Sequence, residues 1–280
     1  MTAPPSAKPA EVVRGVALAF DAVADHYDQS GVAFFEPIAR RLADLVRVRP
    51  GEAVLDVGCG RGAVTLAAAA GTGPTGTVTA IDVSPAMAAH ARRAVVAAGL
   101  EHVRVEVMDA MRPTLPPGSF DVLTSSLVLF FLPDPATALT RWIRLLRQRG
   151  RLGVTTFGRQ DETWQAVDRL FHPHLPAWLL DPRTRGADSP FGSDEGVERL
   201  VGRGGVRDVR TVREWLPVRF RDADQWRDWS MGTGQRAMWR CVPEEDRPGL
   251  FERASALLEQ ARDGEEILLR QEVRYTLARV

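Results

Sequence analysis

An apolar run that breaks into three alternate glycines constrains this chain more than any other feature of its sequence. Residues 53–57 have the length and β-branched content of a buried parallel strand, and residues 61–70 predict a helix. Between them, Gly58, Gly60 and Gly62 permit a tight turn in which a ligand lies against bare backbone. The unpaired N–H groups at the start of the helix suit a ligand carboxylate or phosphate. The stretch therefore predicts a ligand-binding strand–turn–helix unit.

Three carboxylates follow three successive predicted strands. Asp56 lies just before the first glycine, Asp82 ends the apolar run 78–81, and Asp109 follows the run 103–107. The carboxyl ends of parallel strands meet at one edge of an open α/β sheet, where such sheets bind ligands. The glycine pattern alone also fits a dinucleotide site, because it satisfies the looser G-x-G-x-x-A fingerprint. The spacing of the three carboxylates separates the chain from that alternative.

At these positions the chain resembles the class I S-adenosylmethionine-dependent methyltransferases of the small-molecule type, with a core like that of the ubiquinone and menaquinone methyltransferases. Residues 56–62, 81–87, 108–110 and 120–126 look like four motifs of that family, in order. Each motif alone is weak evidence, but four in sequence are highly specific together. The resemblance implies that S-adenosylmethionine is the cofactor and S-adenosylhomocysteine the product.

The resemblance also implies a role for each residue of these motifs. Asp82 would accept hydrogen bonds from both ribose hydroxyls, and Asp109 would accept one from the adenine amino group. The Ala110 N–H would face a ring nitrogen, and Val83 and Met87 would flank the adenine and the ribose. The other predicted cofactor contacts are Gly58, Cys59 and Gly60 in the turn, Asp56 as the support of the loop or the partner of the cofactor ammonium, Ser125 and Ser126 beside the methyl group, and Tyr27 in an N-terminal lid.

The order of the elements predicts the fold class. It is that of an α/β protein with a Rossmann-like, doubly wound sheet of seven strands, a helical N-terminal lid and a cap insertion. We predict a disordered tail over residues 1–10, the lid over 11–50, the cofactor-binding core over 51–158, and cap insertions with the last strands over 159–280. The predicted strands are 53–57, 77–81, 102–107, 120–125, 151–157, 206–218 and 267–277, and the predicted helices are 11–28, 36–48, 61–70, 85–98, 135–147, 194–201 and 243–263.

Aromatic residues outside the core predict the acceptor pocket. Residues 160–205 contain scattered prolines, which favours an irregular insert over the ligand crevice. The tryptophan-rich stretch that follows resembles the variable substrate lid of small-molecule methyltransferases. We predict substrate contacts from Phe34, Phe130, Trp164 and Trp229. The alternative, which applies to Tyr27 as well, is that these rings only pack the lid and the cap.

Methyl transfer from a sulfonium requires an in-line approach of the acceptor and exclusion of water, and no catalytic triad is expected. A phenol or amine acceptor still benefits from a general base, and imidazole titrates near neutral pH. His26 lies beside the predicted lid, and His172 and His174 lie in the predicted cap, so these three are the base candidates. The turn at 129–132 is apolar where many members of the resembled family carry histidine, which argues against a base from that turn.

Composition limits the partners of the chain. Its 36 basic residues balance its 36 acidic ones, so no net charge favours nucleic acid or an anionic membrane. No apolar run approaches the length of a membrane span, no His/Cys cluster has zinc spacing, and Cys59 and Cys241 are far apart. We therefore expect a cytoplasmic protein with a small-molecule substrate and no metal, nucleic-acid or membrane partner. The choice between monomer and homodimer stays open.

The sequence as a whole predicts an enzyme that transfers a methyl group from S-adenosylmethionine to O, N or C of a hydrophobic small molecule in bacterial secondary metabolism. The assignment to bacterial secondary metabolism rests on the arginine-rich composition and the tryptophan-rich cap. An alternative is a methyltransferase-fold protein that binds the cofactor but catalyses a cyclisation or another reaction without methyl transfer. An NAD-dependent oxidoreductase is a third hypothesis, and it predicts binding of NAD in place of S-adenosylhomocysteine.

Overall fold

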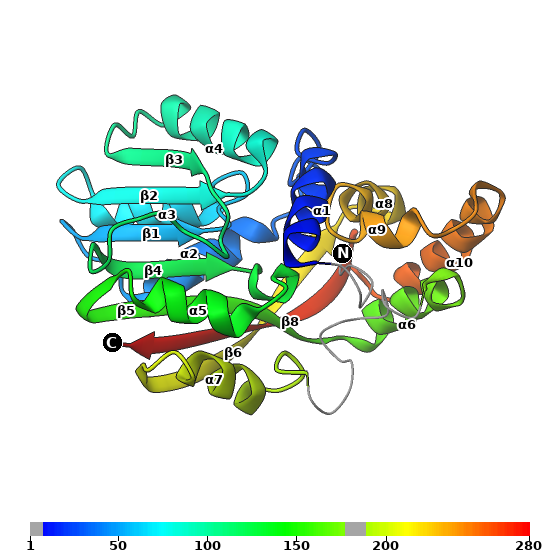
Figure 1. Ribbon diagram of the computed structural model, residues 1–280. Coiled ribbons are helices and arrows are strands. Elements are labelled where there is room, and N and C mark those ends of the chain that lie inside the picture. The colour runs from blue at the N-terminus through cyan, green and yellow to red at the C-terminus, as the bar shows by residue number, and fades with distance from the viewer. Residues whose placement is uncertain (1–7, 177–188) are drawn as a thin grey trace.

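The computed structural model describes residues 8–176 and 189–280. Its centre is one sheet with the strand order β3-β2-β1-β4-β5-β8-β6, and a smaller helical cap lies beyond one end of it (Figure 1). Strands β1 to β5 run parallel, and β8 runs antiparallel to both of its neighbours. The predicted doubly wound α/β sheet is confirmed. The strands are β1 (Ala53–Val57), β2 (Thr77–Asp82), β3 (Val103–Val107), β4 (Phe120–Ser126), β5 (Leu146–Gln160), β6 (Arg207–Phe220), β8 (Glu266–Arg279) and the two-residue β7 (Arg262–Asp263), which pairs with β8.

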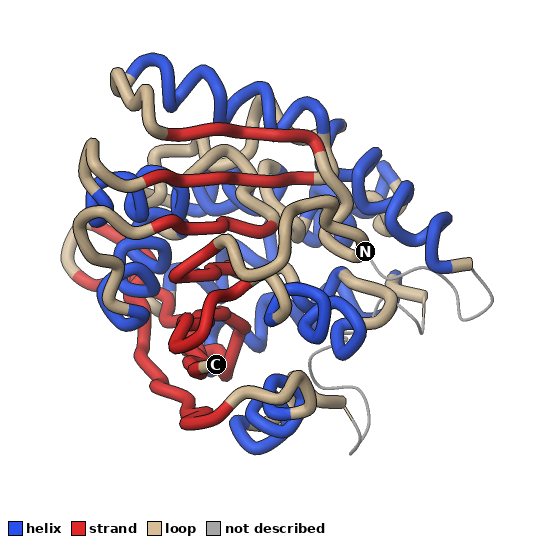
Figure 2. The backbone as a smooth tube through the Cα atoms, turned by 60° about the vertical axis from the view of Figure 1, so that its left-hand side comes forward, coloured by secondary structure: helices blue, strands red, loops and turns tan. Residues whose placement is uncertain are grey.

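Helices cover both faces of the sheet (Figure 2), because side chains alternate along each strand. Leu55 and Val57 of β1 belong to one apolar cluster with residues of α5 (Pro135–Ile143) and α7 (Asp194–Gly202). Val54 packs on the opposite face, against α2 (Phe35–Val46) and α3 (Ala63–Thr72). On that same face α4 (Pro85–Ala97) covers β2 and β3, and it begins as the sequence predicts, because the Ser84 hydroxyl accepts the Met87 N–H at 3.1 Å.

Two boundaries in the core differ from the prediction. The helix expected over 135–147 ends at Ile143, and β5 begins at Leu146 instead of at residue 151. The reason is a pairing of Leu146 with Phe120 of β4, beyond an irregularity in the register of the two strands. This polar, arginine-rich stretch does not have the apolar pattern of a buried strand.

The N-terminal helix α1 (Pro9–Asp21) lies across the carboxyl ends of β1, β2 and β4 (Figure 1). The Asp21 carboxylate fastens it to the start of α4, since Oδ1 accepts the Ser84 hydroxyl at 2.5 Å and the Ala86 N–H at 3.1 Å. The helix starts at Pro9, so the last two residues of the predicted tail are helical, and it ends at Asp21 rather than at residue 28. The rest of the predicted tail, 1–7, lies outside the described residues.

The cap is built on the ends of β6 and β8 that extend past the other strands (Figure 1). Val218 and Phe220 of β6 and Ile267 of β8 share one apolar cluster with the cap tryptophans. The sequence predicts an irregular insert after residue 160, but Asp161 caps a helix there, α6 (Glu162–Phe171). Helix α7 packs on the sheet. Residues 177–188 of the insert lie outside the described residues. The cap elements are α6 (Glu162–Phe171), η2 (His172–His174), α8 (Ala223–Met231), α9 (Arg236–Trp239), η3 (Glu244–Asp246) and α10 (Arg247–Glu259).

A buried carboxylate joins β1 to its neighbours below the glycine turn. Asp56 is 1% exposed and accepts hydrogen bonds from the Thr65 hydroxyl of α3 at 2.7 Å and the Thr124 hydroxyl of β4 at 3.3 Å. At the next residue of β4, the Ser125 hydroxyl donates to the Val57 carbonyl of β1 at 2.9 Å. Burial raises the pKa of Asp56 to about 7, although the two threonine hydrogen bonds oppose the rise.

We expect Asp56→Asn to change how stability depends on pH. Because the pKa of Asp56 is about 7 in the folded state and has its ordinary value of 3.8 in the unfolded chain, the folded state keeps a proton that the unfolded state releases. The stabilising contribution of Asp56 is therefore full at acidic pH and is lost as pH rises through the folded pKa. Between the unfolded pKa of 3.8 and the folded pKa of about 7, the wild type should lose up to about 1.4 kcal/mol of unfolding free energy per pH unit relative to Asp56→Asn. Denaturant titrations of both proteins measure the difference, and a pH-independent difference would contradict the assignment.

Candidate active site

The glycine turn after β1 presents bare backbone at the edge of the sheet. Gly58, Gly60 and Gly62 all have positive φ, of 72°, 54° and 100°. A Cβ at Gly58 would lie 2.4 Å from Cγ2 of Val128, so glycine is required there, whereas a Cβ at Gly60 would meet nothing within 4 Å. The open space at Gly60 lets a ligand approach the main chain closely.

Asp82 at the end of β2 holds this turn and remains an acceptor. Its Oδ2 accepts the Gly60 N–H at 2.8 Å, and its Oδ1 accepts the Ser84 N–H at 2.8 Å. Burial raises the pKa of Asp82, and the two backbone N–H groups oppose that rise. A carboxylate has about four acceptor positions. Two of them are used here, so Asp82 can accept two further hydrogen bonds from a ribose.

The adenine side of the predicted site forms where β3 and the turn after it approach β2. The Asp109 carboxylate accepts the Met111 N–H at 2.8 Å, which folds the turn and brings Ala110 onto the cavity wall. The Ala110 carbonyl accepts the Trp142 indole N–H at 2.7 Å, and this fixes the backbone of the turn. Val83 also lines the cavity, as does Met87.

The lid reaches the turn through Arg61. The Arg61 Nη1 group donates to the carbonyl of Ala24 at 2.5 Å and to that of Asp25 at 3.3 Å. Tyr27 follows directly, and its ring stacks on that of Phe35 with the centroids 4.8 Å apart. The lid therefore covers the turn and places the Tyr27 ring in the cavity wall.

A cavity of about 1980 Å³ begins at the glycine turn and continues beneath the cap, with a branch along the surfaces of α2, α3 and α4. Typical small-molecule sites enclose about 300–1000 Å³, and part of the larger volume here belongs to the branch along these helices. Its walls are aromatic on three sides, with Phe20 from the lid, Phe130 from η1 (Leu129–Phe131), and Trp164 and Trp229 from the cap. Phe34 lies between lid and cap, 5.2 Å from the Trp229 ring.

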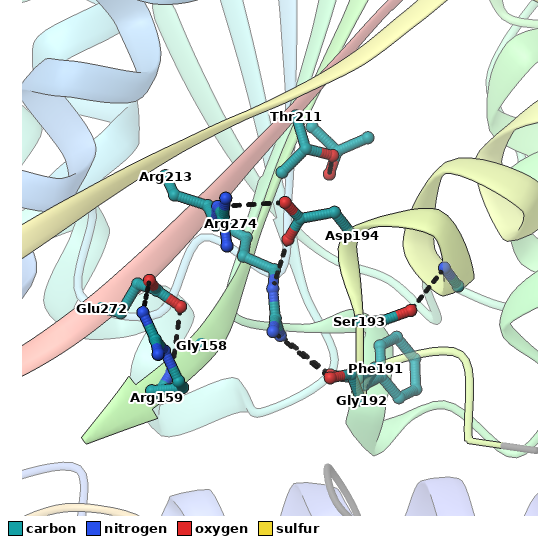
Figure 3. Close-up of polar contacts among 12 residues, drawn as sticks. Gly158, Arg159, Phe191, Gly192, Ser193, Asp194, Thr211, Arg213, Glu272 and Arg274 are labelled. Atoms are coloured by element: carbon teal, nitrogen blue, oxygen red, sulfur yellow. Dashed lines mark hydrogen bonds and ion pairs between the residues drawn. The ribbon is translucent and has the colours of Figure 1, made fainter. Parts of the chain in front are cut away.

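Arg274 holds the segment that leads into α7 (Figure 3). This side chain is 7% exposed on β8; its Nε donates to Asp194 Oδ1 at 2.8 Å, and its Nη1 donates to the carbonyls of Phe157 at 2.8 Å and Phe191 at 3.0 Å. The Phe191 ring meets that of Phe130 edge to face at 6.1 Å. Arg274 thus holds the segment that leads into α7 against the end of β5.

The structure brings most of the predicted site residues to this cavity. Two predicted cofactor contacts do not line it, Asp56 and Ser125, because their side chains bond α3 and β1 beneath the turn. Ser126 lines the cavity instead, with its hydroxyl 2.8 Å from that of Thr155. The predicted residues on the cavity wall are Tyr27, Gly58, Cys59, Gly60, Asp82, Val83, Met87, Asp109, Ala110 and Ser126 for the cofactor, and Phe34, Phe130, Trp164 and Trp229 for the substrate.

The histidines are less well placed for catalysis than the sequence suggests. His26 is exposed on the lid, and neither it nor His174 lines the cavity. His172 does line the cavity, but it is an exposed residue of the cap.

Sequence reasoning missed a carboxylate next to Tyr27. Asp28 has a φ of 56°, lines the cavity and is partly buried, and burial raises its pKa to about 6, although Arg61 opposes this rise. The Tyr-Asp pair is visible in the sequence, but the left-handed backbone that turns the Asp28 side chain is not. Burial and the nearby Asp28 and Asp82 raise the pKa of Tyr27, so its phenol stays protonated at neutral pH.

Within residues 8–176 and 189–280, no three His, Cys, Asp or Glu side chains are grouped so that they could hold a metal ion. In the same residues, no helix has the length and hydropathy that crossing a membrane requires.

Comparison with known proteins finds methyltransferases among the relatives of this chain. A family model described as a methyltransferase domain matches residues 55–154. The chain is 36% identical over 268 residues to the nocamycin O-methyltransferase of Saccharothrix syringae, an alignment that covers 88% of this chain and 89% of that protein. It is 40% identical over 166 residues to the aklanonic acid methyltransferase of Streptomyces sp. (strain C5), covering 59% of this chain and 76% of that one.

Among solved structures, the YcgJ protein from Bacillus subtilis superposes with a TM-score of 0.58 and 18% identity over 87% of this chain and 98% of that chain, which shows a shared fold. The glycine turn, the free acceptor positions of Asp82 and the relative that aligns over most of both chains all indicate the same family. The chain belongs to the class I S-adenosylmethionine-dependent methyltransferases.

Proposed function

We propose that this methyltransferase acts on an oxygen atom of an apolar small molecule of bacterial secondary metabolism. The observation that carries the proposal is the continuity of the cavity, which runs from Asp82 and the glycine turn into the aromatic space between lid and cap. An apolar acceptor in that space is held beside the methyl donor and shielded from water. The choice of oxygen is supported by the similarity to the nocamycin O-methyltransferase, which covers 88% of this chain.

The residues present fit S-adenosylmethionine, whose sulfonium supplies an activated methyl group. Asp82 would hold the ribose hydroxyls, and Val83 and Ala110 would enclose the adenine. The bare backbone at Gly60 would hold the methionine portion, with Tyr27 covering it. We further propose that the enzyme works in the cytoplasm, where its two free cysteines would stay reduced.

Asp28 is our proposed general base. It lies on the cavity wall beside Tyr27, and with a pKa of about 6 it is a carboxylate at neutral pH. A base whose pKa lies near the working pH combines the required ionised form with a useful proton affinity. Asp28 would accept the proton that an acceptor hydroxyl loses as its oxygen is methylated. An acceptor that is already an anion would not need this step.

The test of the function uses S-adenosylmethionine labelled with carbon-13 in its methyl group. Purified protein is incubated with aklanonic acid, naphthol and naphthoic acid, and the products are examined by NMR and mass spectrometry. We expect the label on oxygen, as a methyl ether or a methyl ester. A label on carbon or nitrogen would contradict the choice of oxygen. An altered product without the label would favour the cyclisation hypothesis instead.

Asp82→Asn should weaken binding of S-adenosylhomocysteine by about 10- to 100-fold in calorimetry, because charge-assisted hydrogen bonds to the ribose are lost. Asp121→Asn is the matched control. Asp121 is a carboxylate of β4 at the opposite edge of the sheet, where it accepts the Ala53 N–H at 2.9 Å. The control should bind S-adenosylhomocysteine as the wild type does. Equal affinities for all three proteins would rule out the role of Asp82.

Asp28→Asn should remove the acidic limb of the pH–rate profile. Asp28 must be ionised to accept a proton, so kcat/KM of the wild type should rise with pH through about 6 and then level off. The variant should be slower by about 100-fold at neutral pH, with affinity for S-adenosylhomocysteine retained. Asp25→Asn, on the exposed side of the same turn, serves as the control. An unchanged limb in Asp28→Asn would exclude Asp28 as the base.

A further inference from the structure

One end of the cavity is polar, unlike the aromatic walls near the glycine turn. Four cavity-lining side chains come together there from separate elements: Gln160 from the end of β5, Asp168 from α6, Gln235 from the start of α9 and Gln271 from β8. None of them takes part in the cofactor site. Their hydrogen bonds show which atoms are left for a ligand.

Asp168 accepts one amide N–H from each of two of the glutamines. The Gln160 Nε2 group donates to Asp168 Oδ2 at 3.0 Å, and the Gln235 Nε2 group donates to Asp168 Oδ1 at 3.4 Å. An amide has one carbonyl oxygen in addition to its two N–H donors. With nitrogen directed at the carboxylate, the acceptor Oε1 of each glutamine remains.

Gln271 is oriented more firmly. The side chain is 1% exposed, and its Nε2 lies within hydrogen-bond distance of the carbonyls of Gly158 at 3.5 Å, Arg159 at 3.2 Å and Glu272 at 2.8 Å. The opposite orientation would set an oxygen against three oxygens, so the nitrogen position is fixed. Among the described residues, no donor bonds to the Gln271 Oε1, although this side chain lines the cavity. The side chain is buried but its Oε1 is open to the cavity, so a ligand that donates a proton there gains a hydrogen bond.

The cluster therefore offers acceptor oxygens from three glutamines, together with the second amide N–H of Gln160 and of Gln235. A ligand carboxylate, an ether or a ketone has no proton to donate to the Gln271 Oε1. Arg159 and Arg169, which are exposed, also line the cavity, and their charge disfavours an ammonium group. A neutral hydroxyl is the group that these surroundings favour.

We propose that the acceptor substrate carries a hydroxyl group that binds at Gln160, Gln235 and Gln271, at the end of the cavity formed by β5, β8, α6 and α9. This inference rests on the proposed function, because it assumes a small-molecule acceptor in the cavity. The apolar body of the substrate packs between the aromatic walls, and the hydroxyl sets which of its oxygens faces the methyl donor. A site built to pair a hydroxyl discriminates strongly against an analogue that lacks it.

The experiment compares three ligands of one shape: naphthylethanol, its methyl ether and naphthylethylamine. Their affinities for the protein saturated with S-adenosylhomocysteine are measured by naphthalene fluorescence. We expect the alcohol to bind about tenfold more tightly than the ether, the effect of one hydrogen bond. An alcohol that binds no better than the ether, or does not bind, overturns the proposal. An amine that binds more tightly than the alcohol overturns the assignment to a neutral hydroxyl.

Two variants test the residues. Gln235→Leu and Gln271→Met should each bring the ratio of alcohol to ether affinity toward one, while affinity for S-adenosylhomocysteine stays unchanged. Gln260→Leu is the matched control, an exposed glutamine after α10 that does not line the cavity, and it should keep the wild-type ratio. Gln235→Leu keeps the test decisive if Gln271→Met does not fold. A wild-type ratio of alcohol to ether affinity in Gln235→Leu overturns the proposal, whether or not Gln271→Met folds. Loss of S-adenosylhomocysteine binding by the wild type would instead contradict the cofactor site.

Discussion

The hydrogen bond between the Gly60 N–H and the Asp82 carboxylate is the contact on which the rest of the site depends. It joins the turn after β1 to the end of β2 at 2.8 Å, and the Ser84 N–H holds the second carboxylate oxygen at the same distance. The turn can adopt this position because Gly58 and Gly60 have positive φ and because Gly58 leaves room for Val128. A partly buried carboxylate is thereby kept in one orientation, with acceptor positions left for a ligand.

The second half of the chain supplies the acceptor side of the cavity through one strand. β8 pairs with β5 and β6 in the sheet and continues into the cap, where its apolar residues pack with the cap helices. The same strand carries Arg274, which fastens the wall at Phe191, and Gln271, which forms part of the polar end. In our proposal, the cofactor and the acceptor are therefore bound at opposite halves of one continuous sheet.

The core could be predicted from the sequence because its signals are local. The strand at 53–57 is found where its β-branched run and the following glycines place it, and α4 begins at the capping Ser84. The direction of single side chains is harder to predict. Asp56 lies between Leu55 and Val57, which face α5 and α7, so the alternation of the strand turns it to the α3 face beneath the turn. That alternation, rather than the spacing to the first glycine, decides that Asp56 supports the turn and does not face the ligand.

The acceptor side could not be predicted in the same way, because it is formed by residues far apart in the chain. The prolines after residue 160 favour an irregular insert, yet Asp161 caps α6 by accepting the Trp164 N–H at 2.8 Å. Residue type alone selects the histidines as base candidates, but His26 lies exposed outside the cavity. Asp28, which has a positive φ, lies on the cavity wall. No local sequence pattern predicts that Gln160, Gln235 and Gln271 lie at the same end of the cavity.

A crystal structure with S-adenosylhomocysteine tests the central claim most directly. The account predicts the ribose hydroxyls on the Asp82 carboxylate, the adenine between Val83 and Ala110, and the sulfur directed toward the aromatic part of the cavity. A nucleoside bound away from Asp82, or a sulfur atom directed away from that aromatic space, would contradict it.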